Sequence, residues 1–180
     1  FRQPEPQQVQ IEVGARLQAS DAPYSVFHRQ TCTIYGSGDI LLDNRVETGQ
    51  ELPSLPRIGL TLALPAGFEQ LRWFGRGPHE NYSDRNMGAA VGLYRGTVDE
   101  QYVPYIMPQE NGNKTGVRWL TLTNEAGLGL LATGDSPLEA SVSHYTAADL
   151  FQARHTNELT RRDEIILNLD MTEDGMGGTR

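Results

Sequence analysis

Apolar residues recur at every second position along much of this 180-residue chain. Between Gln8 and Leu17, valine, isoleucine, alanine and leucine alternate with polar residues or glycine, and Ile58 to Leu64 repeats the pattern before Pro65. Because successive side chains of a β-strand point to opposite faces of the sheet, this alternation is typical of strands with one buried face. The pattern therefore predicts an all-β protein.

Shorter segments with the same character raise the number of predicted strands to about ten. The further strands are expected at residues 25–35, 39–47, 69–74, 91–97, 117–123, 127–133, 138–144 and 164–171. The sequences Gly36–Asp39 and Asn124–Gly127 contain residues that tolerate a positive φ, so each predicts a hairpin turn. Only Thr146 to Leu150 suggests a helix, with Thr146 as N-cap and Asp149 completing a capping box.

Length and composition favour one domain. The chain is shorter than the roughly 250 residues at which hydrophobic cores tend to split. Its content of 38% hydrophobic and 21% charged residues is that of a folded protein. We therefore expect residues 1–180 to form a single large antiparallel β-sandwich. The chain begins without Met and ends soon after a glycine-rich stretch, which suggests a fragment of a longer multidomain protein.

Charge and cysteine content exclude several classes of partner. The chain has 15 Lys and Arg against 23 Asp and Glu, a net charge of −8 that opposes binding to a nucleic-acid backbone. It has no apolar run long enough to span a membrane and no apolar signal stretch at its start, so neither is predicted. Its single Cys32 and four scattered histidines match no metal-binding spacing. These features favour a cytoplasmic protein without a metal.

Two polar segments with glycine interrupt the alternation, at residues 73–85 and 108–114. Each follows a predicted strand or a short loop and combines carboxylate, amide and cationic side chains. A sugar site uses such groups, because amides and carboxylates bind hydroxyls while aromatic faces pack on C–H surfaces. The candidate substrate-binding residues are His79, Glu80, Asn81, Arg85, Gln109, Glu110 and Asn111.

The alternative is that these segments are mainly structural. Glycine and proline at positions 75–78 would then shape a tight bend, while the polar side chains satisfy loop backbone and pair with one another. A scaffold role is expected first for Asn81, Asp84 and Arg85, and a ligand-facing role for His79, Glu80 and Glu110.

Glu80 and Glu110 are also the internal candidates for a glycosidase pair, which needs two carboxylates roughly 5 to 10 Å apart. The sequence does not place them face to face, and carboxylates in polar loops commonly serve as plain hydrogen-bond acceptors. We therefore assign no catalytic residue to this chain. Trp73 and Trp119 could stack on a sugar, but both lie in predicted strands and are expected in the core.

Three motifs occur in a fixed order. They are the segment Trp73–Arg85 (WFGRGPHENYSDR), the segment Tyr105–Gly112 (YIMPQENG), and Leu167–Asp170 (LNLD) followed by Gly175–Gly178 (GMGG). In this order they resemble the C-terminal, small-chain domain of glycoside hydrolase family 2 β-galactosidases. The resemblance runs from about residue 55 to the end, whereas residues 1–54 agree only in strand-like character and length. It implies a large antiparallel β-sandwich of the galactose mutarotase-like superfamily.

The resemblance also implies an accessory role. In this family the catalytic glutamates lie on a separate (β/α)₈ barrel, and the magnesium and monovalent-cation sites lie in other domains. We therefore expect the chain to hold no cofactor, to be inactive alone, and to belong to a parent that hydrolyses terminal β-D-galactosides, such as lactose, by a retaining mechanism. The expected partners are the remaining domains of the parent, a galactoside at the domain boundary, and further copies in a homo-oligomer.

One feature of the family falls outside this sequence. The small chain of these enzymes lends a tryptophan to the rim of the active site, shortly after the Gly-x-Gly-Gly loop. Here the sequence ends at Arg180, before that position. Two other functions remain open: a free-standing carbohydrate-binding or mutarotase-like protein acting through His79, Glu80 and Glu110, and a structural module whose polar loops form domain interfaces. Fold alone does not separate these alternatives.

Overall fold

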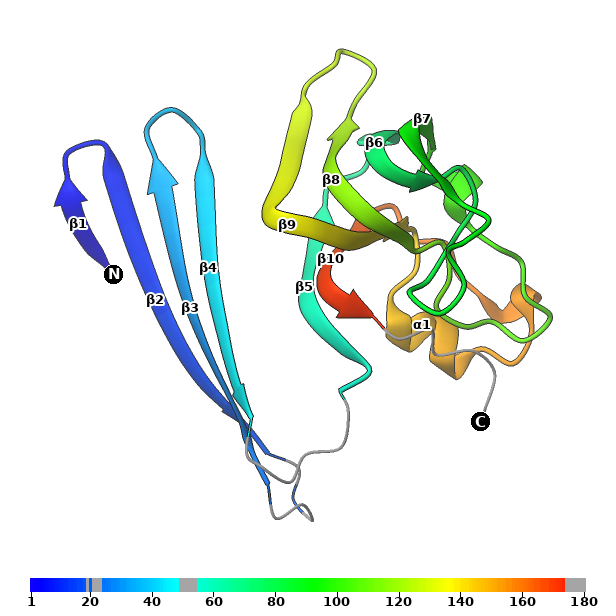
Figure 1. Ribbon diagram of the computed structural model, residues 1–180, viewed down its shortest axis with the longest axis horizontal. Helices are drawn as coiled ribbons and strands as arrows, with labels where there is room; N and C mark the ends of the chain where they lie inside the picture. The colour runs from blue at the N-terminus through cyan, green and yellow to red at the C-terminus, as the bar shows by residue number, and fades with distance from the viewer. Residues whose placement is uncertain (19, 21–23, 49–54, 174–180) are drawn as a thin grey trace. The chain divides into compact units, whose positions relative to one another are not determined.

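The computed structural model describes residues 1–18, 20, 24–48 and 55–173, and its regular secondary structure in this part of the chain is mainly β-strand (Figure 1). The helical segments in this part of the chain are short: α1 (Ala147–Gln152) and the 3₁₀ turns η1 (Asp99–Gln101) and η2 (Thr156–Glu158). The predicted all-β, antiparallel class is confirmed. The chain divides into two compact units, Phe1–Leu55 and Pro56–Arg180, which are described in turn. The expectation of one domain over residues 1–180 stays a prediction.

The first unit is a four-stranded antiparallel sheet with the strand order β1-β2-β3-β4. Its strands are β1 (Arg2–Glu5), β2 (Gln8–Leu17), β3 (Val26–Tyr35) and β4 (Ile40–Thr48). The alternation of apolar residues predicted β2, β3 and β4. The turn predicted at Gly36–Asp39 joins β3 to β4, and in it Gly38 takes a φ of 96°. It missed β1, because this exposed strand carries no apolar alternation.

The apolar face of this sheet is not a closed core. Val9, Ile11 and Val13 share one face of β2, yet each is 37 to 46% exposed. This differs from the expected buried face, because one small sheet has no second layer of its own to cover it.

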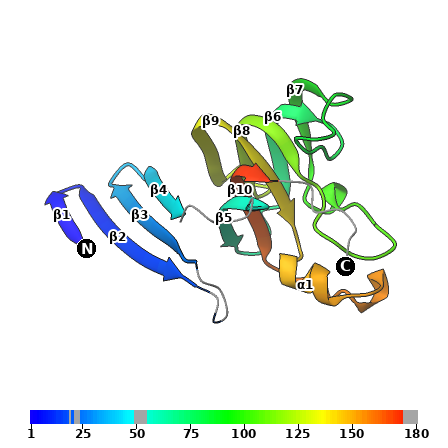
Figure 2. The same cartoon turned by 60° about the horizontal axis from the view of Figure 1, so that its bottom comes forward.

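The second unit is a six-stranded antiparallel sheet with the order β5-β10-β9-β8-β6-β7 (Figure 2). Its strands are β5 (Arg57–Leu64), β6 (Gln70–Gly77), β7 (Ala90–Thr97), β8 (Lys114–Thr123), β9 (Gly129–Ser143) and β10 (Ile165–Glu173). The two strands predicted at 127–133 and 138–144 form the single bent strand β9. Its first half pairs with β8 and its second half also pairs with β10, so the intervening residues bend without breaking the strand.

The core of this unit lies on one face of the six-stranded sheet. It consists of the buried residues Leu64, Leu71, Trp73, Val98, Val117, Leu120, Leu122, Ala140, Val142, Ile165 and Leu167. Trp73 is 2% exposed and its Nε1 donates to the Arg76 carbonyl oxygen at 3.0 Å, which confirms its predicted core position. Trp119 is only half-buried and pairs across the ladder with the exposed Phe74. The register shift between Val117 and Trp119 turns it away from the core, so that prediction is wrong.

The predicted capping box is confirmed at α1. The Thr146 hydroxyl accepts from the Asp149 amide at 3.1 Å, and the Asp149 carboxylate accepts from the Thr146 amide at 2.9 Å. Two further hydrogen bonds from Arg162, with burial opposing them, hold the pKa of Asp149 well below its usual value. The helix is therefore fixed at its start although it spans only six residues.

Candidate functional site

Two connecting segments of the second unit are held against each other. The first, residues 78–89, joins β6 to β7, and the second, residues 102–113, leads from η1 into β8. The Asn81 amide donates to the Asn113 carbonyl oxygen at 2.9 Å, and the Gly112 amide donates to the Glu80 carboxylate at 2.8 Å. The two polar motifs, about 30 residues apart in the chain, thus form one cluster.

Glu80 is the centre of this cluster. One of its oxygens accepts from the Gly112 amide and, at 3.5 Å, from the Tyr82 hydroxyl, while the other accepts from the Tyr105 hydroxyl. Burial, reinforced by the negative charge of Glu80, raises the pKa values of Tyr82 and Tyr105 above that of an ordinary tyrosine. Both phenols are therefore neutral donors to Glu80 at physiological pH.

Gly112 has the backbone shape that this contact needs. Its φ of 80° lies in the left-handed region, and a Cβ atom at this position would come within 2.7 Å of the Gln101 carbonyl oxygen. A side chain at Gly112 would therefore displace the backbone that donates to Glu80.

Asn81 joins the first segment to the beginning of β8. Its side chain is buried, and its Oδ1 accepts from the Thr115 amide at 3.0 Å and the Thr115 hydroxyl at 2.6 Å. Its Nδ2 donates to the His79 carbonyl oxygen at 3.1 Å. These contacts are those expected of a scaffold residue.

Replacing Asn81 with alanine is expected to lower the free energy of unfolding by about 1 to 3 kcal/mol, because the buried Thr115 amide and hydroxyl would lose their acceptor. Urea denaturation measures this change. Ser83→Ala, at an exposed position of the same segment, is the matched control and should change stability by less than about 0.5 kcal/mol. Equal stability of the two variants would show that Asn81 does not hold the segment.

Glu110 is bound to the sheet by an ion pair. Arg57, the first residue of β5, donates from Nη1 to the Glu110 carboxylate at 2.5 Å. The same guanidinium donates from Nε and Nη2 to the two carboxylate oxygens of Asp170 in β10, both at 2.8 Å. Arg57 therefore links β5, β10 and the segment before β8.

The remaining candidates divide into loop-closing and exposed residues. Asn111 closes its own loop, accepting from the Val103 amide at 3.0 Å and donating to the Gln109 carbonyl oxygen at 2.9 Å. The side chain of Gln109 is half-exposed, and His79 and Arg85 are exposed. The Arg85 guanidinium lies 4.2 Å from the Tyr82 ring centroid, where a cation–π contact holds it at the rim.

Asp84 differs from its expected scaffold role. Its side chain is 63% exposed and its contact is a 3.3 Å ion pair with the adjacent Arg85. It holds no loop backbone among the hydrogen bonds of the described residues, because the turn places it toward solvent.

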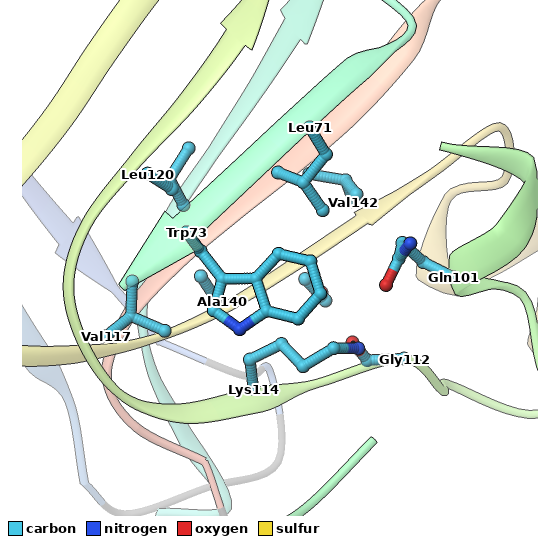
Figure 3. Close-up of a pocket in the computed structure, with 10 residues that line it drawn as sticks. Leu71, Trp73, Gln101, Gly112, Lys114, Val117, Leu120, Ala140 and Val142 are labelled. Carbon is cyan, nitrogen blue, oxygen red and sulfur yellow. The ribbon is translucent and has the colours of Figure 1, made fainter. Parts of the chain in front are cut away.

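A pocket lies in the core beside the cluster (Figure 3). Figure 3 shows the Lys114 side chain running along the Trp73 ring toward Gly112, with Gln101 on the far side of the pocket. The Lys114 ammonium donates to the Gly112 carbonyl oxygen at 2.8 Å and lies 5.4 Å from the Trp73 ring centroid. Burial lowers the pKa of Lys114 to about 8, with Glu80 opposing the shift. Because six of the ten lining residues are aliphatic or aromatic core side chains, the pocket offers few groups for the hydroxyls of a sugar.

Arg57, Asp170 and Lys114 were not among the candidate site residues, although Lys114 lies in the second polar segment and Asp170 in the third motif. Asp170 carried a usable signal, since it is an acid within the apolar strand 165–171, and a buried acid requires a partner. Its partner Arg57 lies 113 residues away, and no local pattern connects the two.

In residues 1–18, 20, 24–48 and 55–173, no three His, Cys, Asp or Glu side chains are placed to hold a metal ion. Over the same part of the chain, the longest α-helix falls far short of the length needed to cross a bilayer. The Gly175–Gly178 motif lies outside the described residues.

Comparison with known proteins places these observations in a family. Residues 2–180 match the family described as the β-galactosidase small chain. A β-galactosidase of Priestia megaterium is 38% identical over 148 residues, which are 82% of this chain and 14% of that protein. A β-galactosidase of Vibrio cholerae is 44% identical over 145 residues, or 81% of this chain and 14% of that protein. The chain thus spans about 14% of the length of these relatives, and it belongs to the β-galactosidase small-chain family.

Proposed function

We propose that this chain is the accessory small-chain domain of a β-galactosidase that hydrolyses terminal β-D-galactosides, with lactose as the expected type of substrate. The supporting observation is the combination of a family match over residues 2–180 with a coverage of only about 14% of each relative. A chain that matches so small a part of the enzymes has its catalytic partners elsewhere in the parent.

The contacts of the two candidate carboxylates support an accessory role. Both oxygens of Glu80 accept hydrogen bonds that join two loops, and Glu110 is paired with Arg57. Glu80 would have to give up contacts that join the two loops before it could exchange a proton with a substrate, and Glu110 is held as a carboxylate by the positive charge of Arg57. We therefore assign the retaining two-carboxylate chemistry to glutamates outside this chain. The magnesium and monovalent-cation sites are assigned there as well.

The surface of the cluster suits a role at the border of an active site. His79, Arg85 and Gln109 offer donors and acceptors that are exposed or half-exposed, while the residues beneath them are fixed by hydrogen bonds. We assign the galactoside, the remaining parent domains and further copies of the parent as partners, and the cytoplasm as the location.

The isolated 180-residue chain is expected to show no turnover of a chromogenic β-galactoside above the buffer rate, because it supplies neither catalytic carboxylate. The Vibrio cholerae relative at the same molar concentration serves as the active control. Turnover by the chain that is lost in a folded Glu80→Gln or Glu110→Gln variant would contradict the proposal and make these residues catalytic.

A titration with galactose separates the accessory role from a free-standing binding module. The chain alone is expected to give no saturable shifts in its nuclear magnetic resonance spectrum, since a rim residue contributes only part of a sugar site. Saturable binding that disappears in a folded Arg85→Ala variant would instead support the carbohydrate-binding alternative.

A further inference from the structure

Arg57 carries one positive charge, but more than one carboxylate lies close to it. It is hydrogen-bonded to Glu110 and Asp170, and it lies opposite Glu173, the last residue of β10, in the β5–β10 register, where the two charges attract. Glu139 of β9 lies opposite Asp170 in the β9–β10 register and accepts a hydrogen bond from Asn113 Nδ2 at 2.8 Å, and its charge also acts on Glu173. We call Glu110, Glu139, Asp170 and Glu173 the carboxylate cluster; it lies where β5, β9, β10 and the segment 108–113 meet.

Glu173 is the member of the carboxylate cluster whose negative charge is least well compensated. It is 3% exposed, and its Oε2 has no hydrogen-bond partner within the described part of the chain, which ends at this residue, whereas the carboxylate of Asp170 accepts two hydrogen bonds. Burial raises the pKa of Glu173 to about 7; Arg57 opposes this shift, and the charges of Glu110, Asp170 and Glu139 add to it. The buried Tyr82 also lies close enough for the charge of Glu173 to act on it, but its phenol is neutral and adds no further negative charge.

The contacts of Arg57 with Asp170 and with Glu110 differ in burial and in the number of hydrogen bonds. Asp170 is fully buried on a central strand and is held by two hydrogen bonds. The Glu110 side chain is 24% exposed, lies on a connecting segment and is held by one hydrogen bond. Water can therefore solvate the Glu110 carboxylate after release from Arg57, but it cannot reach a released Asp170 carboxylate. When Glu173 is ionised, breaking the Arg57–Glu110 contact is thus the least costly way to reduce the repulsion among the carboxylates.

We propose that Arg57, Glu110 and Glu173 form a proton-operated latch on the segment Pro108–Asn113: neutral Glu173 keeps the Arg57–Glu110 contact closed, and ionised Glu173 releases it. The proposal is independent of the proposed function. Opening reaches beyond Glu110, because the next two residues hold the neighbouring contacts, Asn111 with the Val103 amide and Gly112 with Glu80.

The direction of the pH effect follows from proton linkage. Releasing Glu110 frees Arg57 to pair with an ionised Glu173 and removes one neighbouring negative charge, so the pKa of Glu173 is lower in the open state than in the closed one. The closed latch therefore binds this proton more tightly, and closure is strongest at low pH, weakens as the pH rises and levels off above about pH 7.

Hydrogen exchange of the Gly112 and Val103 amides in the 180-residue chain tests the latch. After correction for intrinsic exchange, the protection of both amides is expected to fall severalfold between pH 5.5 and pH 7.5. The Leu150 amide of α1, bonded to the Thr146 carbonyl oxygen, is the internal reference and should not follow this change. Glu173→Gln should keep both amides protected at both pH values.

The matched control is Glu125→Gln, which removes an exposed acid from the turn between β8 and β9 and should retain the wild-type fall. The same fall in Glu173→Gln, or no fall in the wild type, would overturn the proposal. If Glu173→Gln does not fold, Glu110→Gln is the deciding variant. In folded Glu110→Gln the Gly112 and Val103 amides should be weakly protected at both pH values. Protection that still depends on pH in this variant would refute the latch.

Discussion

Replacing Asp170 with alanine is expected to lower the free energy of unfolding of the second unit by about 3 kcal/mol. Asp170 is 0% exposed and accepts two hydrogen bonds from Arg57, whose side chain is 21% exposed. Without Asp170 a largely buried guanidinium loses its main partner. The effect falls at the lower end of the usual 3 to 5 kcal/mol range because Glu110 still pairs with Arg57.

Urea denaturation monitored by tryptophan fluorescence measures this loss, since Trp73 lies in the core of the same unit. Asp84→Ala is the matched control, because it removes an acid whose ion pair is exposed, and it should change stability by less than about 0.5 kcal/mol. A loss at Asp170 no larger than that at Asp84 would show that Arg57 is stabilised without it.

Truncating Leu167 to alanine is expected to cost about 2 to 5 kcal/mol, because the side chain is 0% exposed and its removal leaves a cavity in the core. Met171 lies on the same strand but is 66% exposed, so Met171→Ala should cost less than about 0.5 kcal/mol. Thermal melts of both variants report the difference. Similar melting temperatures would place the core elsewhere than on this face of the sheet.

The strands were predictable because burial of one face leaves a local mark on the sequence. In β5 the alternation required no knowledge of the partner strand. The strand predictions were wrong where pairing with a neighbouring strand changes which side chains face the core. The bulge in β8 turns Trp119 out of the core, and the double pairing of β9 joins two predicted strands. Both depend on the register of a neighbouring strand, which the local pattern does not contain.

The candidate site was predictable in composition but not in connectivity. Its two polar segments stand out because they interrupt the alternation. The hydrogen-bond partner of each polar side chain depends on contacts between segments that are distant in the chain, such as Asn81 with Thr115 and Arg57 with Asp170. These contacts show that most of the polar side chains are used within the fold. Whether His79, Arg85 or Gln109 binds a substrate stays a prediction.

A chimera tests whether this chain serves as the small-chain domain of a larger β-galactosidase. In the Priestia megaterium relative, the 148 residues that match this chain would be deleted or replaced by their counterparts from this chain. We expect the deletion variant to lose hydrolysis of a chromogenic β-galactoside and the chimera to regain it. Full activity after deletion, or no activity in a correctly folded chimera, would contradict the claim.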